Sequence, residues 1–322
     1  TGIAGDALPL RSKPDLSAPI LDVRDLVTRF DLRGGLLNRR VARVHAVESV
    51  SFQIFPGETL SLVGESGCGK STTGKSIIRL NDRSTGSVRL GGDDLFGLGV
   101  DAMRKKRREI QMIPQDPLAS MNPRMTVGDA LVEPFMEHRM GTGAEGRAKA
   151  ARLMEQVGLT AAMRERYPHE FSGGQRQRVC IARALMLDPR LIIADESVSA
   201  LDVSVKAQVV NLLLDIQDRM GIAFLFISHD IAVVERISHR IAVMYMGEIV
   251  EIGPRAEILE RPRHAYTRQL IGAVTVPDPA RRHLRRNQAV TELRTPVRPL
   301  DYVPPTRRYE EVAPDHLVRI DG

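Results

Sequence analysis

The chain has 322 residues, of which 43% are hydrophobic and 27% are charged, and its formal net charge is +6. This length and composition suit one large globular domain with appendages, or two domains, and exclude a chain that is disordered throughout. No run of apolar residues approaches the ~18 that a membrane-spanning helix needs. The two cysteines, Cys68 and Cys180, indicate neither a disulfide framework nor a metal cluster, and they fit a reducing cytoplasm.

The positive charge admits nucleic acid or anionic lipid as a partner, but its distribution argues against nucleic acid. Much of the excess lies in the C-terminal tail and in the run RKKRR at residues 104–108, which we interpret as a solvated helix face. Tryptophan is absent and aromatic residues make up 4% of the chain, so few rings are available to stack on bases. We therefore expect no nucleic-acid partner.

The first fifty-five residues predict a leader followed by two strands. Residues 1–19 lack an apolar signal core and do not begin with Met, which is typical of a flexible leader. Two segments within residues 20–55, ILDVRDLVTRF and VHAVESVSFQIF, are rich in β-branched residues and predict an antiparallel layer. We expect Phe30 to close the first strand and residues 33–43 to form a polar insertion. Phe30 either stacks on a nucleotide base or is an ordinary edge-strand aromatic.

Residues 58–72 read ETLSLVGESGCGKST and contain the pattern G-x-x-x-x-G-K-[ST] between a predicted strand at 59–63 and a predicted helix at 71–80. Glycines allow the close backbone approaches of a loop whose N–H groups surround a phosphate. Lys70 supplies a cation for the β- and γ-phosphates, and the Ser71 hydroxyl can bind Mg²⁺. The predicted nucleotide contacts are Gly64, Glu65, Ser66, Gly67, Cys68, Gly69, Lys70, Ser71 and Thr72.

The middle of the chain predicts a hairpin and then a helical insert. Turn residues at 85–86 and 91–92 indicate the hairpin, and a basic helix at 101–108 and a strand at 109–114 follow. A proline-containing loop then leads to helices at 126–138, 143–157 and 175–187. We interpret residues of about 116–190 as a mostly helical insert in the core.

Core elements resume with buried strands at 191–195 and 223–228, a helix at 203–220 between them, and a hairpin at 241–253. Strands that alternate with helices predict an α/β core with a mostly parallel sheet. Nucleotide then binds at the C-terminal ends of the strands, where Gly64, Asp195 and His229 fall. Residues 277–308 are rich in Pro and Arg with little periodicity, so we expect an extended, weakly structured tail.

An acidic pair, Asp195-Glu196, ends the strand LIIAD. Beside a phosphate loop, Asp195 can hold Mg²⁺ and Glu196 can orient or deprotonate the attacking water. The alternative is a pair that caps a helix, and the phosphate loop favours the catalytic interpretation.

The stretch FSGGQRQR resembles the signature motif of ATP-binding cassette (ABC) proteins. A serine hydroxyl and glycine N–H groups at a helix start offer donors to an anion, whereas a plain helix N-cap would have the same geometry without a ligand. The resemblance implies that Ser172, Gly173, Gly174 and Gln175 contact the nucleotide of a second subunit. It also implies a P-loop (RecA-like) core, and it gives roles to four further residues: Gln115 binds Mg²⁺ or water, Asp202 lies at the dimer interface, His229 contacts the γ-phosphate and Phe30 stacks on adenine.

Two positions depart from the usual pattern of that family. Pro114 precedes Gln115, and Ser197 follows Glu196 where relatives have proline, which leaves the backbone more freedom. The motifs ESGCGKS, QDPLASMNPRMTVG, ISHD and RHAYTRQL look like those of the dipeptide/oligopeptide importer ATPases. That subfamily implies catalysis of ATP hydrolysis by Glu196, His229, Gln115 and Lys70, with Mg²⁺ at Ser71, Gln115 and Asp195. No cysteine follows Cys180, so we expect no iron–sulfur cluster.

The resemblance also implies partners: a second, similar or identical ATPase subunit, two transmembrane permease subunits and a periplasmic or extracellular solute-binding protein. Such a subunit is peripheral, on the cytoplasmic face of the inner or plasma membrane. The competing hypothesis is a soluble ABC-type ATPase that acts on DNA or ribosomes. The DNA-acting class inserts a long coiled coil, but only about a hundred positions separate Lys70 from Ser172 and no heptads are sustained. The ribosome-acting class normally has two cassettes, and this chain has one.

We therefore expect a flexible leader at 1–19, an ABC nucleotide-binding domain at 20–262 with a helical subdomain at about 116–190, and a partly irregular C-terminal extension at 263–322. Deletion of residues 277–322 is expected to spare assembly with the membrane subunits. The solute remains open among dipeptides, longer peptides, nickel chelates and glutathione-like compounds, as does the choice between homodimer and heterodimer.

Overall fold

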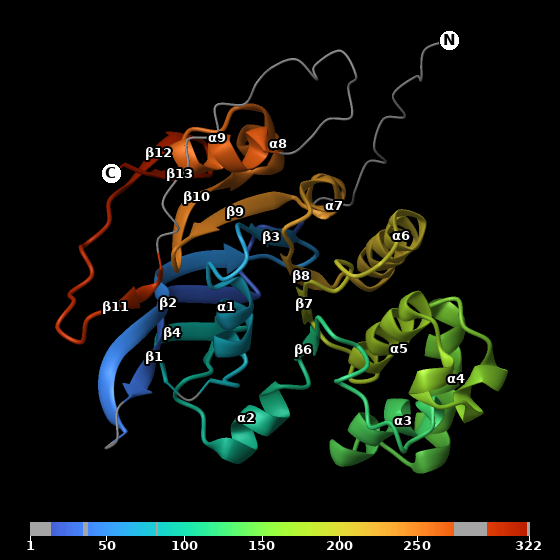
Figure 1. The fold of residues 1–322 in the computed structure, drawn as a ribbon. Coiled ribbons are helices and arrows are strands. Elements are labelled where there is room, and N and C mark those ends of the chain that lie inside the picture. Colours follow the sequence, from blue (N-terminus) through green and yellow to red (C-terminus); the bar gives the residue numbers. More distant parts are fainter. Residues whose placement is uncertain (1–13, 35–37, 82, 274–294, 321–322) are drawn as a thin grey trace, which may run out of the picture. The chain divides into compact units, whose positions relative to one another are not determined.

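The computed structural model describes residues 14–34, 38–81, 83–273 and 295–320 (Figure 1). The chain forms two compact units. The first unit comprises the described residues of Thr1–Asp22, Gln53–Ser61 and Val88–His239, and the second comprises those of Val23–Phe52, Leu62–Ser87 and Arg240–Gly322.

Three parallel strands form the centre of the first unit: β6 (Ile110–Ile113), β7 (Leu191–Asp195) and β8 (Ala223–Ile227). The register pairs Ile113 with Ala194, and Asp195 with Ile227. Every residue of β7 and β8 is buried, as expected for apolar strands covered on both faces. The predicted parallel strands are confirmed, and β3 (Thr59–Val63), which is also fully buried, begins in this unit.

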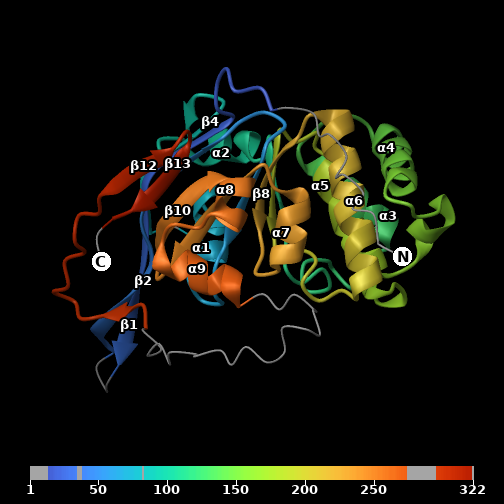
Figure 2. The same cartoon turned by 90° about the horizontal axis from the view of Figure 1, so that it is seen from above.

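Helices make up most of the rest of the first unit. Helices α3 (Val127–Glu137), α4 (Gly143–Gln156) and α5 (Gly173–Leu185) pack together around Leu131, Leu153 and Val179, which confirms the predicted helical segments (Figure 1). Helix α6 (Val203–Met220) runs beside α5, as Figure 2 shows from above. The smaller elements are β5 (Asp93–Asp94), α2 (Val100–Lys106), the 3-10 turns η1 (Ala161–Glu165) and η2 (Pro168–Glu170), and α7 (Ile231–Ile237).

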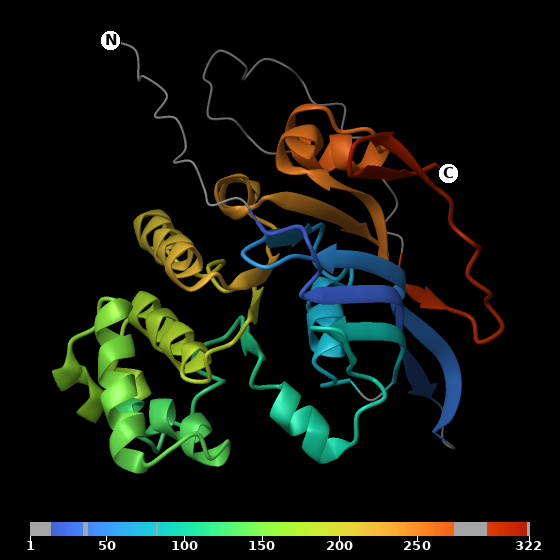
Figure 3. The same cartoon turned by 180° about the vertical axis from the view of Figure 1, so that it is seen from behind.

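The second unit holds most of an antiparallel layer with strand order β11-β2-β1-β4. The strands are β1 (Leu21–Gly34), β2 (Arg39–Ile54), β4 (Ser84–Leu90) and the short β11 (Val297–Arg298). Helix α1 (Lys70–Ile77) lies against this layer, and the Thr28 and Ser76 hydroxyls are 2.8 Å apart (Figure 3). The predicted insertion at 33–43 is wrong for most of its residues, because β1 continues to Gly34 and β2 begins at Arg39. Phe30 therefore lies within its strand and does not close it.

A second antiparallel group in this unit has the order β9-β10-β13-β12. Strands β9 (Arg240–Tyr245) and β10 (Glu248–Pro254) form the predicted hairpin, and α8 (Arg255–Glu260) and α9 (Ala265–Gly272) follow it. Strands β12 (Tyr309–Ala313) and β13 (His316–Arg319) were not predicted. Residues 277–294 of the predicted irregular tail lie outside the described residues.

Candidate functional site

The loop between β3 and α1 approaches neighbouring backbone so closely that two of its positions require glycine. Gly64 has φ 152°, and a Cβ there would lie 2.2 Å from the Met244 carbonyl oxygen. Gly69 has φ 110°, and a Cβ there would lie 2.1 Å from the Ala46 carbonyl oxygen. Because neither position has room for a side chain, only glycine lets the loop pack this closely against β9 and β2.

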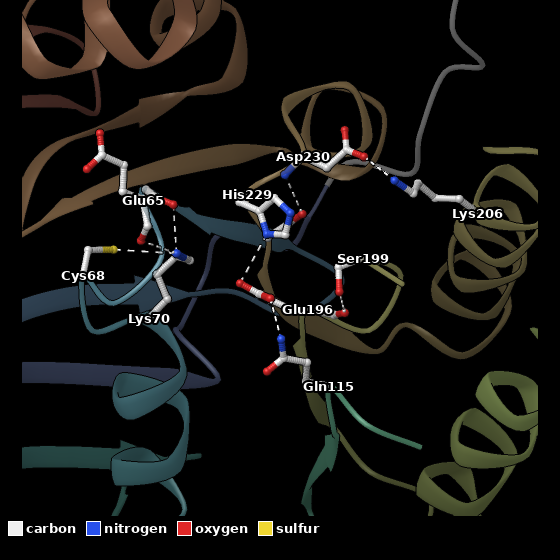
Figure 4. Close-up of polar contacts among 11 residues, drawn as sticks. Glu65, Cys68, Lys70, Gln115, Glu196, Ser199, Lys206, His229 and Asp230 are labelled. Atoms are coloured by element: carbon white, nitrogen blue, oxygen red, sulfur yellow. Dashed lines mark hydrogen bonds and ion pairs between the residues drawn. The ribbon is translucent and has the colours of Figure 1, made fainter. Parts of the chain in front are cut away.

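Lys70 begins α1 and folds back over this loop (Figure 4). Its ammonium donates hydrogen bonds to the carbonyl oxygens of Gly64 and Glu65, both at 2.8 Å. Cys68 Sγ lies 3.7 Å from the same nitrogen. The Lys70 side chain is buried, and these hydrogen bonds from its ammonium to neutral carbonyl oxygens hold it close to the loop.

Tyr266 of α9 contacts the loop from the C-terminal region. Its hydroxyl accepts a hydrogen bond of 3.0 Å from the backbone N–H of Glu65. Tyr266 is buried, and burial raises the pKa of its phenol, so the hydroxyl stays protonated at neutral pH. Sequence reasoning did not select Tyr266 as a site residue. The signal was present only in the stretch RHAYTRQL, which carried the resemblance to peptide importers.

The thiol of Cys68 is enclosed within the loop. Burial raises the pKa of the thiol, and the Lys70 ammonium acts in the opposite direction without cancelling the effect. The Cys68 carbonyl oxygen accepts a hydrogen bond of 2.9 Å from Gly247 N–H in the β9–β10 turn. The residue is therefore a neutral packing element at neutral pH, not an activated thiolate.

The first unit gathers three predicted residues at adjacent strand ends. Gln115, Glu196 and His229 follow β6, β7 and β8, and parallel strands present their C-terminal ends at one edge of a sheet. Gln115 Nε2 donates to Glu196 Oε2 at 2.8 Å, and His229 Nδ1 lies 3.3 Å from Glu196 Oε1 (Figure 4). Each oxygen of the carboxylate therefore has a polar partner of its own.

The backbone of Glu196 is in the left-handed region, with φ 45°. Such a conformation costs a non-glycine residue about 1–3 kcal/mol and persists only when its surroundings hold it. Here Glu196 N–H donates to the Ile227 carbonyl oxygen at 2.9 Å, and the Ser199 hydroxyl donates to the Glu196 carbonyl oxygen, also at 2.9 Å. The strained turn aims the carboxylate at Gln115 and His229.

Two acids that sequence reasoning did not select hold the loops around these residues. Asp116 Oδ1 accepts from the backbone N–H groups of Leu118 and Ala119, at 2.9 and 3.1 Å, which fixes the turn after Gln115. Asp230 follows His229 and accepts from Lys206 Nζ at 2.6 Å (Figure 4). Burial acts to raise the pKa of Asp230, but the hydrogen bonds from Lys206 and from backbone N–H groups, together with the charge of Lys206, outweigh it and the pKa is lowered.

The signature residues begin α5 and form a capping box. Ser172 Oγ accepts from Gln175 N–H at 3.4 Å, and Gln175 Oε1 accepts from Ser172 N–H at 3.0 Å. In this chain both side chains therefore satisfy the first N–H groups of their own helix. Gly174 packs against α6, because a Cβ there would lie 2.4 Å from Val205 Cγ1.

The other predicted residues lie on β1, in the loop, in the first turn of α1, at the end of β7 and before α6. Phe30 is half-buried on β1, Ser66 and Gly67 are exposed in the loop, and Ser71 and Thr72 lie in the first turn of α1. Asp195 is buried at the end of β7, and Asp202 precedes the first residue of α6. The structure thus brings Gly64, Glu65 and Cys68 to Lys70 in the second unit, and Gln115 and His229 to Glu196 in the first.

Two further observations concern only the described parts of the chain. Among those residues, no helix combines the length and apolar character that crossing a membrane requires. Nor do they contain a group of three or more His, Cys, Asp and Glu side chains arranged to hold a metal ion.

Comparisons with known proteins match both halves of the chain. Residues 47–199 match the family described as ABC transporter, and residues 250–297 match the family described as oligopeptide/dipeptide transporter, C-terminal region. The chain is 54% identical over 313 residues to the glutathione import ATP-binding protein GsiA of Pectobacterium atrosepticum, covering 97% of this chain and 50% of that protein. For GsiA of Escherichia coli strain K12 the identity is 56% over 284 residues, with 88% and 46% covered. The chain spans about half the length of these relatives.

Solved structures show the same fold. The dimeric post-hydrolysis state of the ATP-binding cassette MJ0796, bound to ADP and Pi, is 27% identical with a TM-score of 0.65, and the match covers 73% of this chain and 98% of that one. The predicted fold class, an ABC-type α/β core with an antiparallel N-terminal layer, is confirmed. The chain thus belongs to the ABC transporter ATPase family and carries, after its ATPase domain, the C-terminal region of the oligopeptide/dipeptide transporters.

Proposed function

We propose that the chain binds and hydrolyses ATP and is the ATP-binding subunit of an importer for short peptides. The arrangement of Gln115, Glu196 and His229 carries this proposal. An amide donor and an imidazole hold the two oxygens of one carboxylate, which is the arrangement expected of a base that orients the attacking water. The left-handed backbone of Glu196 supports the same role, since strained residues persist where function requires them.

Phosphate binding is assigned to the loop in the second unit. Lys70 now contacts neutral carbonyl oxygens, and a phosphate oxygen would form a stronger, charge-assisted hydrogen bond with the same ammonium. The remaining loop contacts would come from backbone N–H groups and from the first turn of α1. We assign Mg²⁺ to Ser71, Gln115 and Asp195, and adenine stacking to Phe30.

We propose that two such subunits close head to tail around ATP. Ser172–Gln175 and Asp202 would then act on the nucleotide bound by the other subunit, and hydrolysis would reset the dimer. The ATP-binding cassette MJ0796, solved as a dimer in two of its structures, supports this part of the proposal. We retain the expected domains: a nucleotide-binding domain at 20–262 with a helical subdomain at about 116–190, and a C-terminal extension at 263–322.

The solute is proposed to be glutathione or another short peptide. Relatives named for glutathione import and the oligopeptide/dipeptide C-terminal region favour this over an ATPase acting on DNA or ribosomes. The partners would be two permease subunits and a solute-binding protein, with this chain on the cytoplasmic face of the membrane. The direct test is uptake of labelled glutathione into vesicles that carry the permeases and this chain, with a labelled dipeptide as the competing solute.

The variant Glu196→Gln tests the catalytic assignment. It preserves the shape of the side chain but removes its basicity, so we expect ATP binding to persist and turnover to fall at least ~100-fold. Light scattering should detect a dimer that ATP stabilises in this variant. Glu137→Gln is the control, since Glu137 is an exposed acid paired with Arg104 and should leave turnover unchanged. Wild-type turnover in Glu196→Gln would remove Glu196 from the catalytic role.

A further inference from the structure

One peptide unit of the phosphate-binding loop, Gly64–Glu65, is held on both sides. Its C=O accepts from Lys70 Nζ at 2.8 Å, and its N–H donates to Tyr266 Oη at 3.0 Å. A peptide unit is planar, so the directions of its C=O and N–H are linked. Gly64 lacks a Cβ and gives this unit more rotational freedom than another residue would. The Tyr266 hydroxyl therefore fixes the orientation of the carbonyl oxygen that Lys70 contacts.

Tyr266 is itself held rigidly. Its ring packs against Tyr245 of β9, with centroids 4.4 Å apart and an interplanar angle of 38°. The start of its helix is anchored by Glu251 of β10, whose carboxylate accepts from Arg263 N–H at 2.8 Å and from His264 N–H at 2.9 Å. Because these contacts fix both the ring and the helix start, the hydroxyl is presented to the loop from a fixed position.

The anchor extends to the last described strand of the chain. Glu251 Oε1 lies 2.8 Å from Nε2 of His316 in β13, and both side chains are fully buried. A buried carboxylate needs such partners, because a charge taken out of water without them is strongly destabilising. Contacts therefore connect β13, β10, the start of α9 and the phosphate-binding loop.

We propose that Tyr266 is a positioning residue for the phosphate-binding loop, and that through it the C-terminal region sets the affinity of the loop for a nucleoside triphosphate. The inference rests on the proposed function, because it assumes that the loop binds ATP. It also changes one assignment made from the sequence. Glu65 N–H is directed to Tyr266, so Glu65 contributes to the site by holding the loop and not by donating its N–H to a phosphate.

The variant Tyr266→Phe in the full chain removes the hydroxyl and keeps the ring. Loss of one neutral hydrogen bond predicts a rise of about three- to tenfold in the Kd for a fluorescent ATP analogue and in the KM for MgATP. We expect kcat to change less than about twofold, since Glu196 and its partners are unaltered. Tyr245→Phe is the matched control: it removes a hydroxyl from the neighbouring ring and keeps the ring contact, so binding should equal that of the wild type.

Hydrogen exchange provides a readout that does not depend on ATP. Without nucleotide, amides of residues 62–70 should exchange faster in Tyr266→Phe than in the wild type and in Tyr245→Phe. The proposal is overturned if neither exchange nor ATP affinity changes, or if kcat and Tm fall together with affinity as in a general loss of structure. A wild-type chain that binds no ATP would refute the proposed function, and faster exchange of the loop would then still support the positioning contact.

The variant Glu251→Gln tests the anchor of α9. The amide can accept one of the two backbone hydrogen bonds, so α9 should be held less firmly and ATP affinity should fall. If Glu251 acts through Tyr266, the same change made in the Tyr266→Phe variant should cause little further loss. Fully additive losses would show that Glu251 acts by another route and would overturn this part of the proposal.

Discussion

Lys70 and Tyr266 hold opposite sides of the same peptide unit, Gly64–Glu65, although one residue begins α1 and the other lies in α9. The lysine belongs to the phosphate-binding motif, and the tyrosine lies within residues 250–297, which match the C-terminal region of the oligopeptide/dipeptide transporters. The loop geometry is therefore not a property of its own sequence alone. The local motif here depends on a contact from a distant part of the chain.

The glycines of the loop should differ sharply in their tolerance of alanine. Gly64→Ala places a Cβ 2.2 Å from the Met244 carbonyl oxygen at φ 152°, so we expect a loss of at least about 3 kcal/mol in the free energy of unfolding, or a displaced loop without ATP affinity. Gly67→Ala is the control, because its φ is 81° and nothing lies within 4 Å of the new Cβ. It should cost only the ~1–2 kcal/mol of a left-handed alanine. Urea unfolding measures both, and equal costs would contradict the clash at Gly64.

Alkylation of Cys68 should be slow at neutral pH. Burial raises the pKa of this thiol, so its thiolate fraction at pH 7.5 lies below that of a free cysteine. The thiolate fraction grows only when the pH rises above the ordinary cysteine pKa of ~8.5. Iodoacetamide labelling followed by peptide mass spectrometry separates Cys68 from Cys180 without a mutation. The urea-unfolded chain is the control and should react at the rate of free cysteine. Under the proposed function, bound ATP should slow the reaction further, and a native rate equal to the unfolded one would contradict the enclosed position.

Contact with α6, and not backbone conformation, should decide which side chains position 174 tolerates. Gly174→Ala brings a Cβ to 2.4 Å from Val205 Cγ1, and we expect a net destabilisation of about 1–3 kcal/mol from overpacking. The double variant Gly174→Ala with Val205→Ala should recover much of that loss. Gly173→Ala is the control, since its nearest neighbour, Leu201 Cδ2, lies at 3.7 Å. Thermal unfolding distinguishes these cases, and no recovery in the double variant would contradict the contact.

His316 should contribute strongly to stability although it lies near the end of the chain. His316→Ala removes the side-chain partner of the buried Glu251 carboxylate, and we expect a loss of about 2–5 kcal/mol. Leu317→Ala is the matched control. Leu317 is next to His316 in the sequence but its side chain is exposed, so this substitution should lower the free energy of unfolding by less than ~1 kcal/mol. Equal effects in urea unfolding would contradict the buried pair. The burial of His316 also predicts that deletion of residues 277–322 lowers the free energy of unfolding.

Much of the fold was predictable because its elements have strong local signals. The helix at 203–220 coincides with α6, since its apolar residues follow helical spacing and Gly221 ends it in a left-handed conformation. The buried strands at 191–195 and 223–228 were equally clear, as uniformly apolar segments bounded by polar residues. Strand β12 was missed because its residues are mostly exposed and show no alternation, and β13 was missed because four residues are too few for a clear periodic signal. Pairing of β13 with β10 and with β12 supplies the hydrogen bonds that local sequence does not.

The sequence by itself determined the chemical groups: the glycines, lysine and serine of the phosphate-binding loop, and the amide, carboxylate and imidazole at three strand ends. It could do so because these motifs are local and their spacing follows from strand, loop and helix geometry. Only the tertiary structure decided which groups contact one another. Tyr266 reaches Glu65, and His316 reaches Glu251, through contacts between segments far apart in the chain. Such contacts depend on packing and burial, which no local pattern of residues encodes.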